Sequence, residues 1–169
     1  LPQALGVEVK MPGEDCEIDI ISIHDDNGLP TVVVGEVKSR MDSIEEEDLE
    51  HLGKVQRHLR SNGIECVALV AVMRDLRSSE KEILRRFSER PLTNLPRRSQ
   101  ILPVLPIVFT VGDLSVPYLG EGHPAKEMAG YEGVLTLAEH SCRRNLGLVT
   151  LEPSSGGSDF YFRPVWDGP

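Results

Sequence analysis

The sequence of 169 residues has no long apolar segment and no surplus of basic charge. Its longest apolar stretch is interrupted by Pro103 and Pro106, so nothing approaches the roughly 20 residues that a membrane-spanning helix needs. The chain carries 27 acidic and 18 basic side chains, a formal net charge of −9. This balance argues against a protein that binds nucleic acid through overall charge, although it is compatible with a local basic surface beside a metal site.

Cysteine is scarce, and its positions fit neither a disulfide framework nor a metal-ligand motif. Cys16, Cys66 and Cys142 are odd in number and widely spaced, and two of them lie inside apolar runs. Because no secretory or transit signature opens the chain, we expect buried free thiols in a reducing cytoplasm. The sequence begins at Leu1 without a methionine, so we also expect it to be a piece of a longer protein.

The composition, 40% hydrophobic and 27% charged, is that of a globular protein and excludes global disorder. Apolar residues recur at the spacing of strands or helices over most of the chain up to residue 111. In contrast, residues 112–131 are rich in glycine and proline, and residues 154–158 have the sequence SSGGS. We therefore assign residues 1–111 as a core. Residues 112–169 are expected to be a C-terminal extension of the same domain with irregular loops and a tail.

Two segments rich in β-branched residues predict an antiparallel hairpin. Residues 16–23 predict its first strand, with a bulge near Ile20 and Ile21, and residues 31–38 predict its second strand. Residues 25–30 between them are dense in turn-forming residues, as a hairpin connection requires.

Capping boxes, in which serine or threonine is followed three residues later by glutamate, predict the starts of three helices. The pairs are Ser43 with Glu46, Ser79 with Glu82, and Thr136 with Glu139. In the first helix, Leu49, Leu52 and Val55 recur at helical spacing. The second helix should end before Pro91, and the third should reach Asn145.

Residues 64–73 are almost continuously apolar, a pattern typical of a strand buried on both faces beside helices. Further strands are expected at residues 5–9, 101–111 and 146–151. The core order of three strands, helix, strand and helix predicts an α/β sandwich with a central mixed β-sheet flanked by helices.

Asp19, Glu36 and Lys38 form the arrangement that most clearly suggests chemistry. Alternate residues of a strand share a face, so Glu36 and Lys38 should project to one side, where the hairpin brings Asp19 close. Two carboxylates and an ammonium suit Mg²⁺, which takes carboxylate oxygens, waters and substrate phosphate oxygens. The alternative is a salt-bridged cluster at a sheet edge. Chemistry is preferred because Asp19 lies mid-strand between Ile18 and Ile20, where merely buried charges are costly.

These residues resemble the PD-(D/E)XK nuclease superfamily, which includes many type II restriction enzymes, archaeal Holliday junction resolvases and RecB-type nuclease domains. The resemblance comprises Asp19, then Glu36-Val37-Lys38 on the partner strand, then a helix and a buried strand, over roughly the first half of the chain. It implies a restriction-endonuclease-like fold and a metal-dependent endonuclease that hydrolyses phosphodiester bonds, more in DNA than in RNA. Mg²⁺, for which Mn²⁺ can substitute, would be held by Asp19, Glu36 and the Val37 carbonyl, while Lys38 positions or activates the attacking water.

The family pattern also directs attention to positions outside this motif. Its usual proline before the aspartate is Ile18 here, and about fifteen residues precede the hairpin where members usually carry a helix with a further acidic residue. Glu8 could replace that acid, although a surface glutamate is the preferred interpretation. Some branches place a glutamine or lysine on the helix after the motif, for which Gln56 and Lys54 are candidates. Gln56 is favoured as a catalytic residue, with a solvent-facing amide as the equally weighted alternative.

Basic residues concentrate in one segment of this acidic chain, from position 81 to position 98. A phosphate-contacting surface and a solvated helix face are balanced interpretations of this cluster. The residues assigned to nucleic-acid binding are Arg85, Arg86, Arg90, Arg97 and Arg98.

Three functional hypotheses follow. The first is an Mg²⁺-dependent nuclease acting as the effector domain of a longer cytoplasmic protein, recruited by an upstream regulatory or targeting domain or by homodimer or higher oligomer formation. The second is a catalytically inactive nuclease-like fold that serves as a nucleic-acid-binding or assembly module. The third is an unrelated α/β interaction domain. The complete Asp, Glu and Lys set favours the first.

Overall fold

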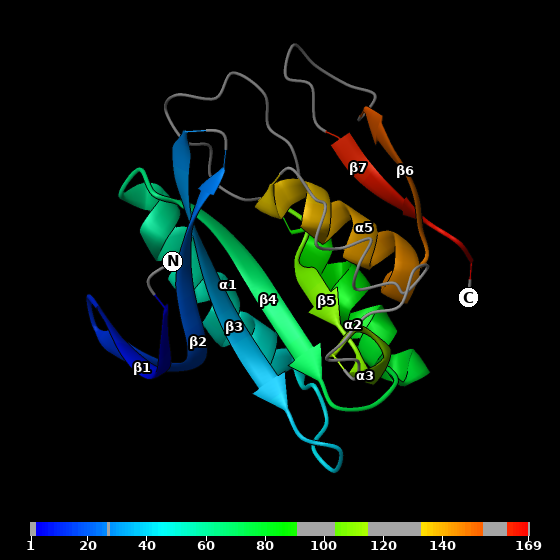
Figure 1. The fold of residues 1–169 in the computed structure, drawn as a ribbon, viewed down its shortest axis with the longest axis horizontal. Helices are drawn as coiled ribbons and strands as arrows, with labels where there is room; N and C mark the ends of the chain where they lie inside the picture. The colour runs from blue at the N-terminus through cyan, green and yellow to red at the C-terminus, as the bar shows by residue number, and fades with distance from the viewer. Residues whose placement is uncertain (1–2, 27, 91–103, 115–132, 154–161, 169) are drawn as a thin grey trace.

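The structure, a computed structural model, describes residues 3–26, 28–90, 104–114, 133–153 and 162–168. Its main feature is a five-stranded sheet with the strand order β1-β2-β3-β4-β5 (Figure 1). The strands are β1 (Gln3–Met11), β2 (Glu14–Asp26), β3 (Leu29–Lys38), β4 (Glu65–Val72) and β5 (Ile107–Phe109). Strands β1, β2 and β3 pair antiparallel, whereas β3, β4 and β5 are parallel. The predicted α/β fold with a mixed sheet is therefore confirmed.

Helices occupy the connections between the parallel strands. The described helices are α1 (Glu46–Ser61), α2 (Ser78–Ser88), α3 (Val111–Leu114) and α5 (Val134–Leu146). Helix α1 links β3 to β4 and packs against both strands, and α2 follows β4 (Figure 1). A helical crossover of this kind is what parallel neighbouring strands require. Within the described ranges, no helix is long and apolar enough to cross a membrane.

The core lies between α1 and the central strands. Leu49, Leu52 and Val55, the apolar stripe predicted from their spacing, are almost fully buried. Strand β4 is buried along nearly its whole length, as its continuous apolar sequence predicts. Removing a leucine or valine side chain from water contributes roughly 1.5–3 kcal/mol, so this layer stabilises the placement of α1 beside β3. The three cysteines are free and buried, as expected.

All three helices begin at residues other than those the capping boxes predict. Helix α1 begins at Glu46 rather than after Ser43, α2 at Ser78 rather than after Ser79, and α5 at Val134 rather than after Thr136. Before α1, the Ser43 hydroxyl accepts a hydrogen bond from Arg77, and the Ile44 N–H donates to Glu80. In α2 the carboxylate that accepts the Arg77 N–H is also Glu80, at 2.9 Å, and not Glu82. At the starts of α1 and α2 the capping carboxylates are therefore Asp48 and Glu80, which accept the N–H groups of Glu45 and Arg77, in place of the predicted pairs.

The strands also differ from expectation. Ile20 pairs with Gly35 and Ile21 pairs with Val34 in unbroken succession, so the bulge predicted there is wrong. Both isoleucines are half-buried, which accounts for two adjacent apolar residues without a change of register. Strand β5 has three residues of the predicted 101–111, of which 101–103 lie outside the described residues.

A second, two-stranded sheet consists of β6 (Leu148–Pro153) and β7 (Phe162–Trp166). Strand β6 corresponds to the last predicted strand, whereas β7 was not predicted. The hairpin is joined to the rest of the fold at its open end, where the Asp167 N–H donates to the Gly147 carbonyl at 2.8 Å. The Trp166 indole also donates to Glu89 at the end of α2, at 3.3 Å.

Helix α5 satisfies the hydrogen-bonding groups of β5 on the side away from β4. The Ser141 hydroxyl accepts the Val108 N–H at 3.0 Å, and the Asn145 amide donates to the Val108 carbonyl at 2.8 Å. An unpaired strand edge is a template for association with another chain, so these side chains close that edge of the sheet.

Candidate active site

Asp19 lies where the hydrogen-bonded ladder between β2 and β3 ends. The last pair of that ladder is Ile20 with Gly35, and Ile20 directly follows Asp19 in the chain. Beyond this pair, Oδ2 of Asp19 accepts the backbone N–H of Val37 at 2.7 Å. The carboxylate therefore takes the place of a strand carbonyl and is fixed against the end of β3.

Lys38, the last residue of β3, connects this strand to α1. Its Nζ donates to Oε1 of Glu36 at 2.9 Å and to Oδ1 of Asp48 at 2.8 Å. The side chains of Lys38, Glu36 and Asp48 are 17%, 21% and 20% exposed, so the cluster is largely shielded from solvent. Glu36 and Lys38 share a face of β3, as their alternation predicts, and Asp48 reaches them from the first turn of α1.

The cluster carries more negative than positive charge. Burial raises the pKa of the Glu36 carboxyl; the hydrogen bond from Lys38 opposes this effect, and the negative charges of Asp19 and Asp48 add to it. Burial alone would lower the pKa of Lys38, but its hydrogen bonds to Asp48 and Glu36 outweigh burial and raise it above the usual lysine value. Three carboxylates against one ammonium leave two net negative charges when all are ionised. A divalent cation would neutralise them.

The donor set suits a hard cation such as Mg²⁺. Asp19, Glu36 and the Val37 carbonyl offer oxygen ligands only, and Mg²⁺ keeps several waters when one or two carboxylates hold it. In the part of the chain that the structure describes, no group of three or more His, Cys, Asp or Glu side chains is placed to hold a metal ion. A metal at this site would thus depend on two carboxylates, a carbonyl, water and substrate oxygens.

Gln56 is not part of this cluster. It is 1% exposed, and its amide donates to the Cys66 carbonyl on β4 at 2.9 Å. Cys66 pairs with Val32, whereas Lys38 pairs with Val72, so the two positions lie six residues apart along the strands, about 20 Å. The structure therefore places Gln56 in the core, neither facing solvent nor beside Lys38.

The other candidates from the sequence have separate partners. The Lys54 ammonium pairs with Glu14 of β2 at 2.7 Å, on the hairpin away from Lys38. Glu8 is exposed on β1 and lies 4.0 Å from Lys10.

The described arginines of the predicted nucleic-acid surface contact different neighbours. Arg85 donates twice, at 2.9 and 2.6 Å, to the Leu146 carbonyl at the end of α5. Arg86 pairs with Glu46 of α1 at 2.7 Å, where both side chains are more than half exposed. Arg90 lies over the ring of Phe87, 5.6 Å from its centroid. The final two predicted residues, Arg97 and Arg98, lie outside the described residues.

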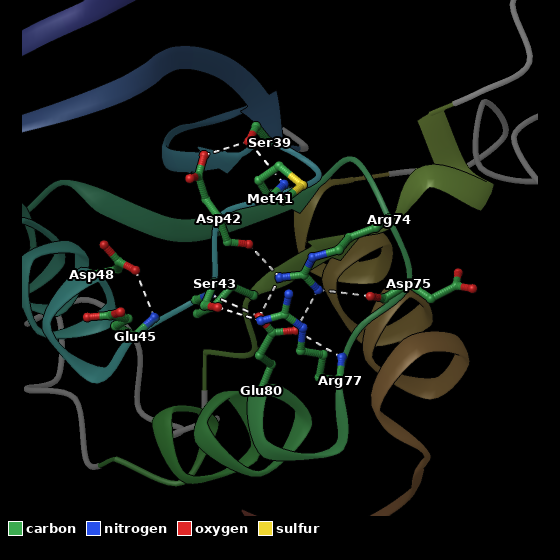
Figure 2. A network of polar contacts seen from close by, with 11 residues as sticks. Ser39, Met41, Asp42, Ser43, Glu45, Asp48, Arg74, Asp75, Arg77 and Glu80 are labelled. Atoms are coloured by element: carbon green, nitrogen blue, oxygen red, sulfur yellow. Dashed lines mark hydrogen bonds and ion pairs between the residues drawn. The ribbon is translucent and has the colours of Figure 1, made fainter.

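A polar network fixes the loop that joins Lys38 to α1 (Figure 2). Glu80, only 2% exposed, receives two hydrogen bonds from the Arg74 guanidinium, at 2.7 and 2.6 Å. It also accepts the N–H groups of Ile44 and Arg77, at 3.0 and 2.9 Å. Arg74 donates further to the Asp42 carbonyl at 2.6 Å. The β3–α1 loop is thereby tied to the loop that follows β4.

Sequence reasoning overlooked Asp48 as a site residue. The acidic residues from Glu45 to Asp48 are typical of a helix N-terminus, and Asp48 has that role in the structure, where its Oδ2 accepts the Glu45 N–H at 2.8 Å (Figure 2). The second role, through Oδ1, depends on the packing of α1 beside β3. A short connection from Lys38 to an acidic first turn was the available signal.

In comparisons with known proteins, no family model, curated protein or solved structure matches the chain. Interpretation of the site therefore depends on its own geometry and on the motif in the sequence.

Proposed function

We propose that the chain is an Mg²⁺-dependent nuclease of the restriction-endonuclease-like fold, which hydrolyses phosphodiester bonds in DNA rather than RNA. One observation carries the proposal: at the end of β3 the Asp19 carboxylate accepts the Val37 N–H and Lys38 pairs with Glu36, on a sheet whose strand and helix order suits the PD-(D/E)XK motif. The two net negative charges of the cluster add support, because a divalent cation would relieve them.

Each residue then has a defined role. Asp19, Glu36 and the Val37 carbonyl would hold the metal, which when bound polarises a phosphoryl oxygen and lowers the pKa of water. Lys38 donates hydrogen bonds, so it orients the attacking water and stabilises negative charge on the phosphoryl oxygens. Water oxygen bonds to phosphorus as one ester P–O bond breaks, and the products are a phosphate monoester and a hydroxyl group.

A specific observation also favours a nuclease-like module without turnover. Asp19 already holds the Val37 N–H, and Lys38 is already bound by Glu36 and Asp48. These contacts hold the charged residues together in the absence of metal, as a purely structural cluster requires.

A plasmid-nicking assay separates the two candidates. Wild type should nick supercoiled DNA with Mg²⁺ or Mn²⁺ and lose this activity in EDTA, and a parallel RNA substrate tests the preference for DNA. Lys38→Ala should cut far more slowly while still binding metal and DNA, because the lysine acts on water and developing charge. Lys54→Ala is the matched control, since it removes a lysine that pairs with Glu14 outside the site.

The outcomes are distinct. Cleavage by wild type and by the Lys54 variant, with loss in the Lys38 variant, would establish the nuclease. Metal-independent DNA binding without cleavage of duplex, single-stranded or RNA substrates would favour the binding module. Cleavage by Lys38→Ala at the wild-type rate would remove this residue from the proposed mechanism.

A further inference from the structure

Asp48 uses its two carboxylate oxygens for different tasks. Oδ2 accepts the Glu45 N–H at 2.8 Å and so caps the start of α1. Oδ1 accepts from the Lys38 ammonium at 2.8 Å. The helix cap and the proposed catalytic lysine therefore share one rigid group, because the cap bond fixes the plane in which the other oxygen lies.

We infer that Asp48 is the positioning residue for Lys38, holding its ammonium at the point where the attacking water and the scissile phosphate meet. The inference rests on the proposed function, since it assumes that Lys38 acts in phosphodiester hydrolysis. A lysine side chain loses rotamer entropy when it is held in one orientation. Asp48 supplies a charge-assisted hydrogen bond that offsets this cost before substrate arrives.

The second partner of Lys38 cannot perform the same task during the reaction. Glu36 is proposed as a metal ligand, and a bound divalent cation competes with the ammonium for its carboxylate oxygens. Asp48 belongs to α1 rather than to the proposed ligand set, so its contact with Lys38 can persist when the site is filled. It becomes the principal anchor of the ammonium in the loaded site.

The position of Asp48 is itself secured from both sides. Leu49, the next residue, is buried in the core and ties the first turn of α1 to the sheet. On the loop side, the Ile44 N–H donates to Glu80 at 3.0 Å, and Glu80 is held by Arg74 (Figure 2). This arrangement gives Asp48 little freedom to follow Lys38, so the lysine must adopt the position that Asp48 defines.

Three variants test the inference. Asp48→Asn keeps the size of the side chain and one oxygen to cap the Glu45 N–H, but it presents an amide donor to the Lys38 ammonium. Glu47→Gln is the matched control, because it also removes one carboxylate from the exposed first turn of α1 and changes the helix-end charge equally. Lys38→Ala removes the ammonium that Asp48 is inferred to position, so in this variant a change at Asp48 should have no further effect.

The measurements are single-turnover cleavage rates, DNA affinity by fluorescence anisotropy with Ca²⁺, and Mn²⁺ affinity by calorimetry. Asp48→Asn should slow cleavage roughly 10- to 100-fold, the range typical of partners that orient a site residue, with DNA and metal affinities within about twofold of wild type. Glu47→Gln should cut within about twofold of the wild-type rate. Adding Asp48→Asn to Lys38→Ala should cause no further loss, because residues that act as a unit are not additive.

Other outcomes overturn the inference. A large loss of Mn²⁺ affinity in Asp48→Asn would make Asp48 a metal ligand instead, and equal slowing by Glu47→Gln would reduce its role to the helix end. An additive loss in the Lys38→Ala background would show that Asp48 acts independently of the lysine. A wild type that never cleaves refutes the proposed function, whereas a wild type that cleaves no faster than Asp48→Asn refutes only the positioning role.

A stability cycle provides a readout that needs no activity. The cycle measures urea unfolding of wild type, Asp48→Asn, Lys38→Ala and the variant with both changes. It should show coupling between Asp48 and Lys38 of roughly threefold or more in the unfolding equilibrium constant. The absence of coupling would contradict the contact itself, whether or not the protein is a nuclease.

Discussion

The buried carboxylate of Glu80 makes the stability of this protein strongly dependent on acid pH. Burial would raise the pKa of Glu80, but the hydrogen bonds from Arg74, Arg77 and Ile44 outweigh burial and lower it from 4.5 to about 2. Each pKa unit corresponds to about 1.4 kcal/mol, so the ionised carboxylate contributes about 3 kcal/mol to the free energy of unfolding. Because the pKa is lower in the folded state, this contribution is complete above pH 4.5 and is lost as the pH falls toward 2.

Glu80→Gln tests this reasoning without creating a cavity. The variant should lose about 3 kcal/mol or more of unfolding free energy at pH 7, since it leaves the half-buried Arg74 guanidinium without its carboxylate. Its free energy of unfolding should also lack the decrease between pH 5 and pH 3 that protonation of Glu80 causes in the wild type. Glu82→Gln, at an exposed position of the same helix, is the matched control and should change stability by less than about 0.5 kcal/mol.

The assay is urea unfolding, followed by far-UV circular dichroism, at intervals from pH 7 to pH 3. The difference between wild type and Glu80→Gln should shrink steadily as the pH falls below 4.5. A difference that stays constant over this range would refute the lowered pKa, and a difference below about 1 kcal/mol at pH 7 would refute the role assigned to the network.

Two further predictions concern the site and the arginines. Glu36→Gln should abolish Mn²⁺ binding in calorimetry, and unchanged binding would contradict its role as a ligand. The variant should not lower the urea midpoint at pH 7, because burial and the neighbouring carboxylates disfavour the ionised Glu36 in the metal-free protein. Arg85→Ala should lower the free energy of unfolding by roughly 1–3 kcal/mol, because it leaves the Leu146 carbonyl without the hydrogen bonds that Arg85 donates. Arg86→Ala should lower it by less than about 1 kcal/mol, because the ion pair of Arg86 with Glu46 is exposed. If Arg86 contacts phosphate, its loss should also reduce the log–log salt slope of duplex binding by about 0.9, and an unchanged slope would assign it to the surface ion pair alone.

Local patterns predicted the part of the fold that local forces determine. The sequence shows the alternation of apolar and polar residues in β2 and β3 and the apolar run of β4, because burial of one or both faces of a strand determines which residues must be apolar. The same alternation placed Glu36 and Lys38 on one side, and the hairpin brought Asp19 beside them. These features depend on residues that lie close together in the chain.

Two of the missed features depend on partners distant in sequence. Ser43 was expected to cap a helix, but its hydroxyl is engaged by Arg77, 34 residues away. Arg85 belongs to a dense basic segment, yet its guanidinium serves the Leu146 carbonyl, 61 residues away. Charge density along the chain reveals neither contact, because the direction of a helical side chain is decided by the neighbour against which the helix packs.

The charge balance of the cluster at the end of β3 supports the proposed function over a purely structural role. A structural salt bridge needs one acceptor for one ammonium, and Asp48 alone supplies it to Lys38. Glu36 and Asp19 add negative charge that this pairing does not neutralise, and burial makes the charge of Glu36 more costly still. The hydrogen bonds from the Val37 N–H to Asp19 and from Lys38 to Glu36 compensate only part of this charge in the metal-free state. Under the proposed function the remaining charge would be neutralised by a divalent cation, for which both carboxylates would be ligands, and Lys38 would face the reacting phosphate.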